Sequence, residues 1–325
     1  MNRREESVMK RVAFMAIALA LVFSAGIGRS SARPAAQGAD LLRLLPDGTG
    51  VVVVDVQKVT SSSLWAMISD KSPVKDVLQK INEVSDLGIS INDFKTAAVV
   101  FGPTGPNNFT AAVSGTFNKD NLLARVRADQ RIRLTSEKYK NYEVYNVARV
   151  SQTEAKKDDF AFMFPDAGTV VAGTQAGVRA SIDTLTGSKP GVAQNAKLAA
   201  GLSSDSTSAV RFAIEMTPSM TSGLQSSEVP LPDFSSINMI FGGVDFASGV
   251  GINATLRSNT AEQAKGLADR LNGILGMAKA YLGSSTDPKM VALNEALKTV
   301  TINGADVDVK ITGNLPMELL SQVLR

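Results

Sequence analysis

The sequence predicts an α+β fold with mainly antiparallel sheets and helices packed on one face. Apolar runs of strand length follow one another across short turns, so hairpins outnumber crossover units. Amphipathic segments that begin at capping residues separate these runs. One order of elements, two strands and a helix followed by strands and a helix, occurs within 95–187 and again within 237–325. We interpret this recurrence as a diverged internal duplication.

Residues 1–32 have the three parts of a cleavable export signal. Residues 1–11 carry four basic side chains, 12–25 are apolar or small, and the stretch ends in the small residues 30–32. An apolar run of 14 residues is short for a membrane span, which needs about 20. We therefore expect a periplasmic or extracellular protein without a stable membrane span. The alternative is an inner-membrane protein anchored through an uncleaved segment 12–27.

Removing the leader also removes the basic character of the chain. The whole sequence has 34 basic and 31 acidic residues, and the leader holds five of the former and two of the latter. The remainder is neutral, with 29 of each. A neutral chain has no long-range field to attract nucleic acid, so we expect no nucleic-acid partner.

The chain contains neither cysteine nor histidine. These absences exclude disulfides, bacterial lipid attachment, histidine-based catalysis and the usual ligand sets for zinc or haem. We therefore expect no cofactor and no metal. An enzyme would need carboxylate or Ser/Lys chemistry.

A short spacer at 33–39 precedes a first α+β half at 40–202. Its expected helices cover 40–45, 72–88, a segment that Asn118 caps, and another that Thr174 caps. Its expected strands cover 51–56, 96–101, 109–117, 142–147 and 160–172, with the last folded into a hairpin at 165–168.

A Ser/Pro-rich connection at 203–236 contains one expected strand, 209–215, and leads to the second half at 237–325. Strands are expected at 237–241 and 250–256. A helix should start at Thr260, lined by apolar residues up to Ile274 and Leu275, and another at Asp287-Pro288 with Met290 facing inward. A hairpin turned at 303–304 and a final helix at 317–324 complete this half.

No motif predicts catalysis. Residues 249–254 match the letters of a dinucleotide fingerprint, but apolar residues alternate through them as in a strand. Thr135…Lys138 and Thr186…Lys189 have the S-x-x-K spacing with threonine in place of serine, and we attribute both to chance. Asp306 and Asp308 are expected to face solvent. Asp55 interrupts an apolar strand, where a capping role is favoured over catalysis.

One charged cluster, from Arg125 to Lys140, carries a net charge of +4 with three tyrosines in or beside it. Such a cluster can hold an anionic glycan, a phospholipid head or an acidic partner. The candidate contacts are Arg131, Arg133, Lys138 and Tyr139. The alternative, which we favour, is an exposed helix end and an edge strand kept soluble by their charge.

Two stretches resemble those of a loosely defined set of exported bacterial proteins of unknown function. These are Leu44-Leu45-Pro46-Asp47-Gly48-Thr49 before the strand 51–56, and the segment 164–174 before Val178-Arg179-Ala180-Ser181-Ile182. The resemblance covers most of the chain after the leader. It implies a fold and no chemistry.

These observations predict an exported cell-envelope protein, a non-enzymatic module for binding or scaffolding. An envelope protein or an anionic ligand is the expected partner. The alternative is a histidine-independent hydrolase that uses carboxylate or Ser/Lys chemistry.

Overall fold

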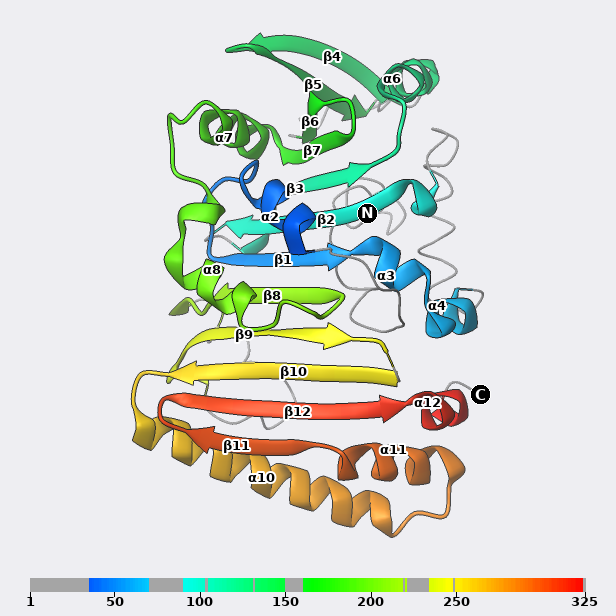
Figure 1. Ribbon diagram of the computed structural model, residues 1–325, viewed down its shortest axis with the longest axis vertical. Helices are drawn as coiled ribbons and strands as arrows, with labels where there is room; N and C mark the ends of the chain where they lie inside the picture. The colour runs from blue at the N-terminus through cyan, green and yellow to red at the C-terminus, as the bar shows by residue number, and fades with distance from the viewer. Residues whose placement is uncertain are drawn as a thin grey trace, which may run out of the picture.

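The described strands form one continuous antiparallel sheet. A computed structural model describes residues 35–69, 90–102, 105–130, 132–149, 160–218, 220, 234–247 and 249–323. The sheet has 12 strands in the order β11-β12-β10-β9-β8-β1-β2-β3-β7-β6-β5-β4 (Figure 1). Helices pack against it, so the class is α+β, as the sequence predicts.

The strands run as follows: β1 Gly50–Asp55, β2 Phe94–Gly102, β3 Gly105–Gly115, β4 Ile132–Tyr139, β5 Tyr142–Arg149, β6 Phe160–Asp166, β7 Thr169–Thr174, β8 Val210–Glu215, β9 Ile237–Asp245, β10 Gly249–Ser258, β11 Thr301–Ala305 and β12 Asp308–Pro316. The α-helices run as follows: α2 Ala35–Leu42, α3 Val56–Thr60, α4 Ser63–Ile68, α6 Lys119–Ala128, α7 Gln175–Leu185, α8 Ala196–Ser203, α10 Ala261–Gly283, α11 Pro288–Lys298 and α12 Met317–Val323. Short 3₁₀ turns η3 (Ile91–Asp93) and η4 (Val192–Gln194) precede β2 and α8.

Both halves of the sheet follow the same path. Three consecutive strands lie side by side, β1-β2-β3 in one half and β8-β9-β10 in the other. Helix α6, or the pair α10–α11, then carries the chain to the far edge of the sheet, at β4 or β11. Hairpins bring it back, so that β7 pairs with β3 and β12 pairs with β10. This order contains the predicted recurrence of two strands and a helix followed by strands and a helix, and it adds one strand before each occurrence, β1 or β8.

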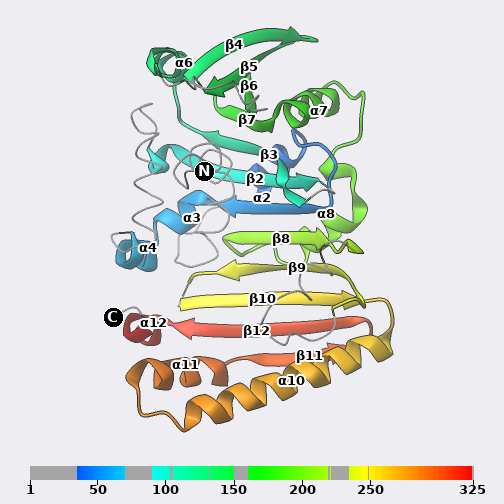
Figure 2. The same cartoon turned by 180° about the vertical axis from the view of Figure 1, so that it is seen from behind.

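Strands β1 and β8 join the two halves at the centre of the sheet. They pair antiparallel from Gly50–Ile214 to Val54–Val210. Below them in Figure 1, α10 runs along β11 at the end of the molecule, and the reverse view in Figure 2 shows the same arrangement.

The core lies on both faces of the sheet, since side chains alternate along each strand. On β6, Ala161 and Met163 pack in a core with Ile182 of α7, whereas Phe162 packs with Leu123 of α6. Helices α2, α7 and α8 therefore cover one face, and α3, α6 and α10 cover the other. The prediction of helices on one face is corrected accordingly.

Predicted caps are confirmed wherever they fall in described residues. The side chains of Asn118, Thr174, Thr260 and Asp287 each accept a backbone N–H at the start of α6, α7, α10 and α11. The strand expected at 209–215 is β8 and the expected hairpin at 165–168 joins β6 to β7.

Two expected element bounds are corrected by the structure. The first described helix covers 35–42 rather than 40–45, so most of the expected spacer is helical. The last hairpin turns at Asp306-Val307 rather than at 303–304, because Ala305 pairs with Asp308. The charged segment 125–140 contains the end of α6 and the strand β4 at the edge of the described sheet, which is the alternative that we favoured. The predicted leader 1–32 and the predicted helix 72–88 lie outside the described residues. Within the described part of the chain, no helix has the length and apolarity of a membrane span.

Candidate functional site

The structure divides the predicted anion-contact residues between two faces of the sheet. Arg133 and Tyr139 lie at odd positions of β4, on the face that α7 covers, and Lys138 lies at an even position on the opposite face. Arg131 is outside the described residues. Tyr139 packs beside the α7 core, while Tyr145 packs with Leu123 of α6. The described members therefore do not converge on one pocket.

The Tyr139 side of the sheet carries a network centred on Asp183. This carboxylate, buried on α7, binds Lys140 Nζ at 2.7 Å and Lys189 Nζ at 3.2 Å, and it accepts the Tyr139 hydroxyl at 3.1 Å. Lys140 also donates to Thr186 and Ser188, each at 2.8 Å. The hydrogen bond from Lys140 lowers the pKa of Asp183, with smaller contributions from the other two donors. The network fastens the β4–β5 hairpin to α7.

A second ion pair supports the same contact. Glu137 Oε1 binds Arg179 at 2.7 Å and also accepts from Asn146 and Gln175. The Arg179 guanidinium lies 5.4 Å from the Tyr139 ring centre, within cation–π range. Lys140 lies in the hairpin turn at a positive φ of 53°, a backbone conformation that is unfavourable for lysine. Its bonds to Asp183, Thr186 and Ser188 hold it in that conformation.

The opposite face of the hairpin is also internally paired. The Tyr145 hydroxyl donates to Glu143 Oε2 at 2.7 Å. Burial, followed by this bond, raises the pKa of Tyr145 to about 12. A shallow hollow beside them is lined by Ser136, Glu137, Lys138, Asn141 and Glu143. Two carboxylates and one ammonium do not favour an anion there.

The acidic residues that the sequence singled out have structural positions: a helix cap, an ion pair and a hairpin turn. Asp55 Oδ1 accepts the Lys58 N–H at 3.0 Å and caps α3, as expected. Asp308 forms a two-point ion pair with Arg257 at 2.8 and 2.9 Å. Asp306 lies in the last hairpin turn at a φ of 51°. Residues 249–254 belong to β10 and open no helix, which removes the nucleotide fingerprint.

Neither Thr/Lys pair has the arrangement that Ser/Lys-type catalysis needs. Thr135 and Lys138 lie on opposite faces of β4. Lys189 binds Asp183, and the Thr186 hydroxyl bonds the Ile182 carbonyl at 2.9 Å. Across the described residues, no three acidic side chains come together as a metal site would require.

An exposed apolar surface lies on α10, where the sequence predicts a buried face. The first two turns pack Ala264, Leu267 and Ala268 against the sheet. Further along the helix, Ile274 is 39% exposed, Met277 67% and Tyr281 78%. The spacing i, i+3, i+7 places these three on one side of α10.

Helix α11 also exposes apolar side chains. Met290 and Val291, at its first turn, are 39% and 43% exposed, although Met290 was expected to face inward. The turn 284–287 joins α10 to α11, so the exposed apolar residues come from the second half of α10 and the adjoining first turn of α11 (Figure 1). We call Ile274, Met277, Tyr281, Met290 and Val291 the apolar corner.

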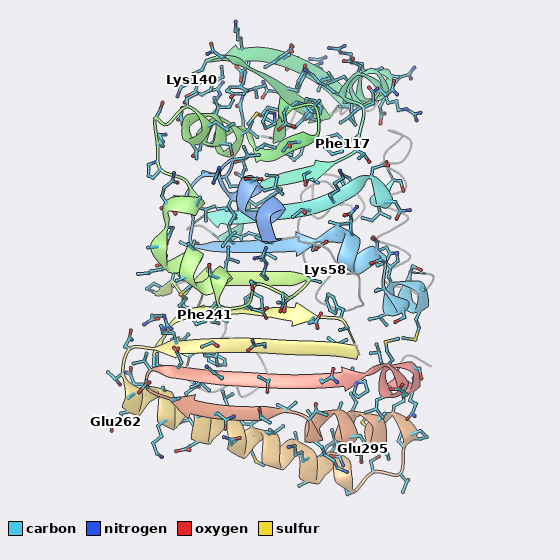
Figure 3. The ribbon with its side chains drawn as sticks, in the orientation of Figure 1. Lys58, Phe117, Lys140, Phe241, Glu262 and Glu295 are labelled. Atoms are coloured by element: carbon cyan, nitrogen blue, oxygen red, sulfur yellow. The ribbon has the colours of Figure 1, made fainter. Side chains whose placement is uncertain are left out.

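Sequence periodicity misses the apolar corner because it does not show where a helix extends past the edge strand beside it. The 23 residues of α10 extend about 34 Å, whereas the five of β11 extend about 17 Å. A comparison of the two lengths is the signal that exposes it. Figure 3 places Glu295 of α11 and Lys140 at opposite ends of the molecule, so the corner is separate from the Asp183 network.

Comparisons with known proteins return distant structural similarity. No family model and no curated protein matches the chain. Crystal form III of TP0453 is 11% identical with a TM-score of 0.47, over 91% of this chain and 99% of that chain. Crystal form I is 11% identical with a TM-score of 0.43, over 91% of this chain and 97% of that chain. Crystal form IV is 12% identical with a TM-score of 0.48, over 90% of this chain and 98% of that chain.

Proposed function

We propose that this protein is exported and acts in the cell envelope as a non-enzymatic binding module that docks a partner protein at the apolar corner. The observation that carries the proposal is the exposure of Ile274, Met277 and Tyr281 along one side of α10. Clustered apolar side chains of this size on a surface are typical of sites where proteins meet.

Charge supports a weakly charged partner. The segment 261–298, which forms α10 and α11, holds five basic and four acidic side chains. Without a dominant sign there is no field to attract a strongly charged ligand. An apolar face of another envelope protein therefore fits the corner better than an anionic ligand does.

The leader supports export. The mass of the protein tests this part of the proposal, because a cleaved chain begins near Arg33 and an uncut chain keeps all 32 leader residues. Intact-mass measurement of the protein recovered from the envelope should give the shorter form. Recovery of the full-length form in membranes would instead support anchoring through segment 12–27.

Tyr281→Glu tests the docking surface. It removes the most exposed of the corner side chains and adds a charge, whereas Thr286→Glu adds the same charge in the adjacent turn. We expect the native complex in an envelope extract, sized by gel filtration, to shrink to the mass of the free protein only with Tyr281→Glu. Equal complexes for both variants would exclude the corner as the docking surface. Unfolding midpoints of the two variants provide the folding control.

A further inference from the structure

We propose that strand β4 is a self-association surface, where two copies of this chain pair their β4 strands antiparallel about a two-fold axis at Thr135. This inference does not depend on the apolar corner. Strand β4 ends the sheet order, so among the described strands it has a neighbour, β5, on one side only. Its eight residues offer a longer edge than the five of β11.

The hairpin geometry determines which backbone groups face outward. Tyr139 pairs with Tyr142 across the two-residue turn 140–141, so they form a hydrogen-bonded pair. Alternate residues of β4, at odd positions, then bond to β5. The N–H and C=O groups of Ile132, Leu134, Ser136 and Lys138 are directed to the open edge, ready for another strand.

Symmetry restricts the register. A two-fold axis perpendicular to the sheet keeps each face on the same side in both copies, so odd residues meet odd residues. Centring on Thr135 places Arg133 opposite Glu137 of the second copy, twice, and Thr135 opposite itself. Centring on Ser136 would place Glu137 opposite Thr135 and Arg133 opposite Tyr139. Of these two registers, only the first places opposite charges across from one another, and such pairs stabilise neighbouring strands.

The charges of β4 suit that register on both faces. Arg133 is exposed, and Glu137 keeps a partly exposed carboxylate. The three bonds to Glu137 from within its chain end on Oε1, so Oε2 is the second acceptor for an incoming guanidinium. On the other face, Lys138 meets Ile132 and no like charge. Lysine on an edge strand commonly blocks pairing with another strand, but in this register Lys138 lies opposite an uncharged residue and is not repelled.

An engineered cysteine tests the axis directly, because the chain has no cysteine of its own. In the proposed dimer the two Thr135 Cβ atoms are about 4.5 Å apart, close enough for a disulfide. Thr135→Cys should form a covalent dimer under mild oxidation. Arg133→Cys should not, because the two 133 positions are separated by roughly 13 Å along the strands.

Complementary charge variants test the register. Arg133→Glu alone and Glu137→Lys alone each place like charges opposite one another, so sedimentation should show dimerisation weakened by roughly tenfold. An equimolar mixture restores both opposite-charge pairs and should form a heterodimer. Arg127→Glu, which makes the same charge change on α6, should dimerise like the wild type. Thermal unfolding of each variant controls for the loss of the Arg179 contact in Glu137→Lys.

Three outcomes would overturn the proposal. These are a monomer at the highest soluble concentration together with no Thr135→Cys cross-link, equal cross-linking at 133 and 135, and open-ended assembly that needs β11. A Thr135→Cys dimer with the matching charge rescue supports it. Failure here leaves the Tyr281→Glu result unaffected, so the two proposals are tested separately.

Discussion

Asp183 holds the β4–β5 hairpin to α7 through two lysines and a tyrosine. Its side chain is 10% exposed, so its charge is well shielded from water and depends on Lys140, Lys189 and Tyr139. Loss of the carboxylate leaves two ammonium groups without their partner. The contribution is larger than that of an ordinary surface ion pair because the acceptor is buried.

Asp183→Asn should therefore lower the free energy of unfolding by about 2 kcal/mol at neutral pH. The folded-state pKa lies below the ordinary 3.8, so the stabilisation is present above that value and is lost as the pH falls below it. Urea titrations should show the difference from wild type shrinking in acid. The exposed Asp40→Asn serves as control, with an expected change within about 0.5 kcal/mol. A difference that grows in acid would contradict this assignment.

The structural roles of individual residues were predictable where they depend on neighbouring residues in the chain. The caps Asn118 and Thr174 were predictable because a cap depends on the next three residues alone. Asp55 was predictable for the same reason. The grouping of Arg133, Lys138 and Tyr139 was not, since treating the segment as one cluster ignored the alternation that a strand imposes.

Helix α10 combines a buried half and an exposed half in one element. Leu267 is 4% exposed and packs with Leu256 and Val309, whereas Met277 is 67% exposed. The helical period was predictable from the sequence, and so was the start at Thr260. The extent of burial was not, because it also depends on β11 and β12, which follow α11 later in the chain.

The two halves of α10 should respond differently to alanine. Leu267→Ala should lower the free energy of unfolding by about 2–5 kcal/mol, since it leaves a cavity under the helix. Met277→Ala should change it by no more than about 0.5 kcal/mol. Chemical denaturation measures both. Equal losses would mean that Met277 is buried and that the apolar corner does not exist in solution.

At the scale of the molecule, the β1–β8 pairing merges the two halves into one sheet. The recurrence of elements was predictable, but this pairing was not, because it joins residues more than 150 positions apart with no local signal. One core cluster crosses the junction and contains Val54 and Ala97 with Phe246 and Leu320. The halves therefore share their core.

A shared core predicts a common unfolding transition. Trp65, the single tryptophan, packs against the cluster that crosses the junction. Its fluorescence and the far-ultraviolet circular dichroism of the whole chain should report the same urea midpoint. Separate midpoints would show that the halves unfold as independent domains.

The most direct test of the proposed function is a photo-activated cross-linking residue placed at position 281 in living cells, with position 286 as the matched control. We expect a discrete adduct with one envelope protein from position 281 and none from position 286, because the proposed complex places the apolar corner against that partner. Equal cross-linking from both positions, or cross-linking from neither, would contradict the proposed docking role of this surface.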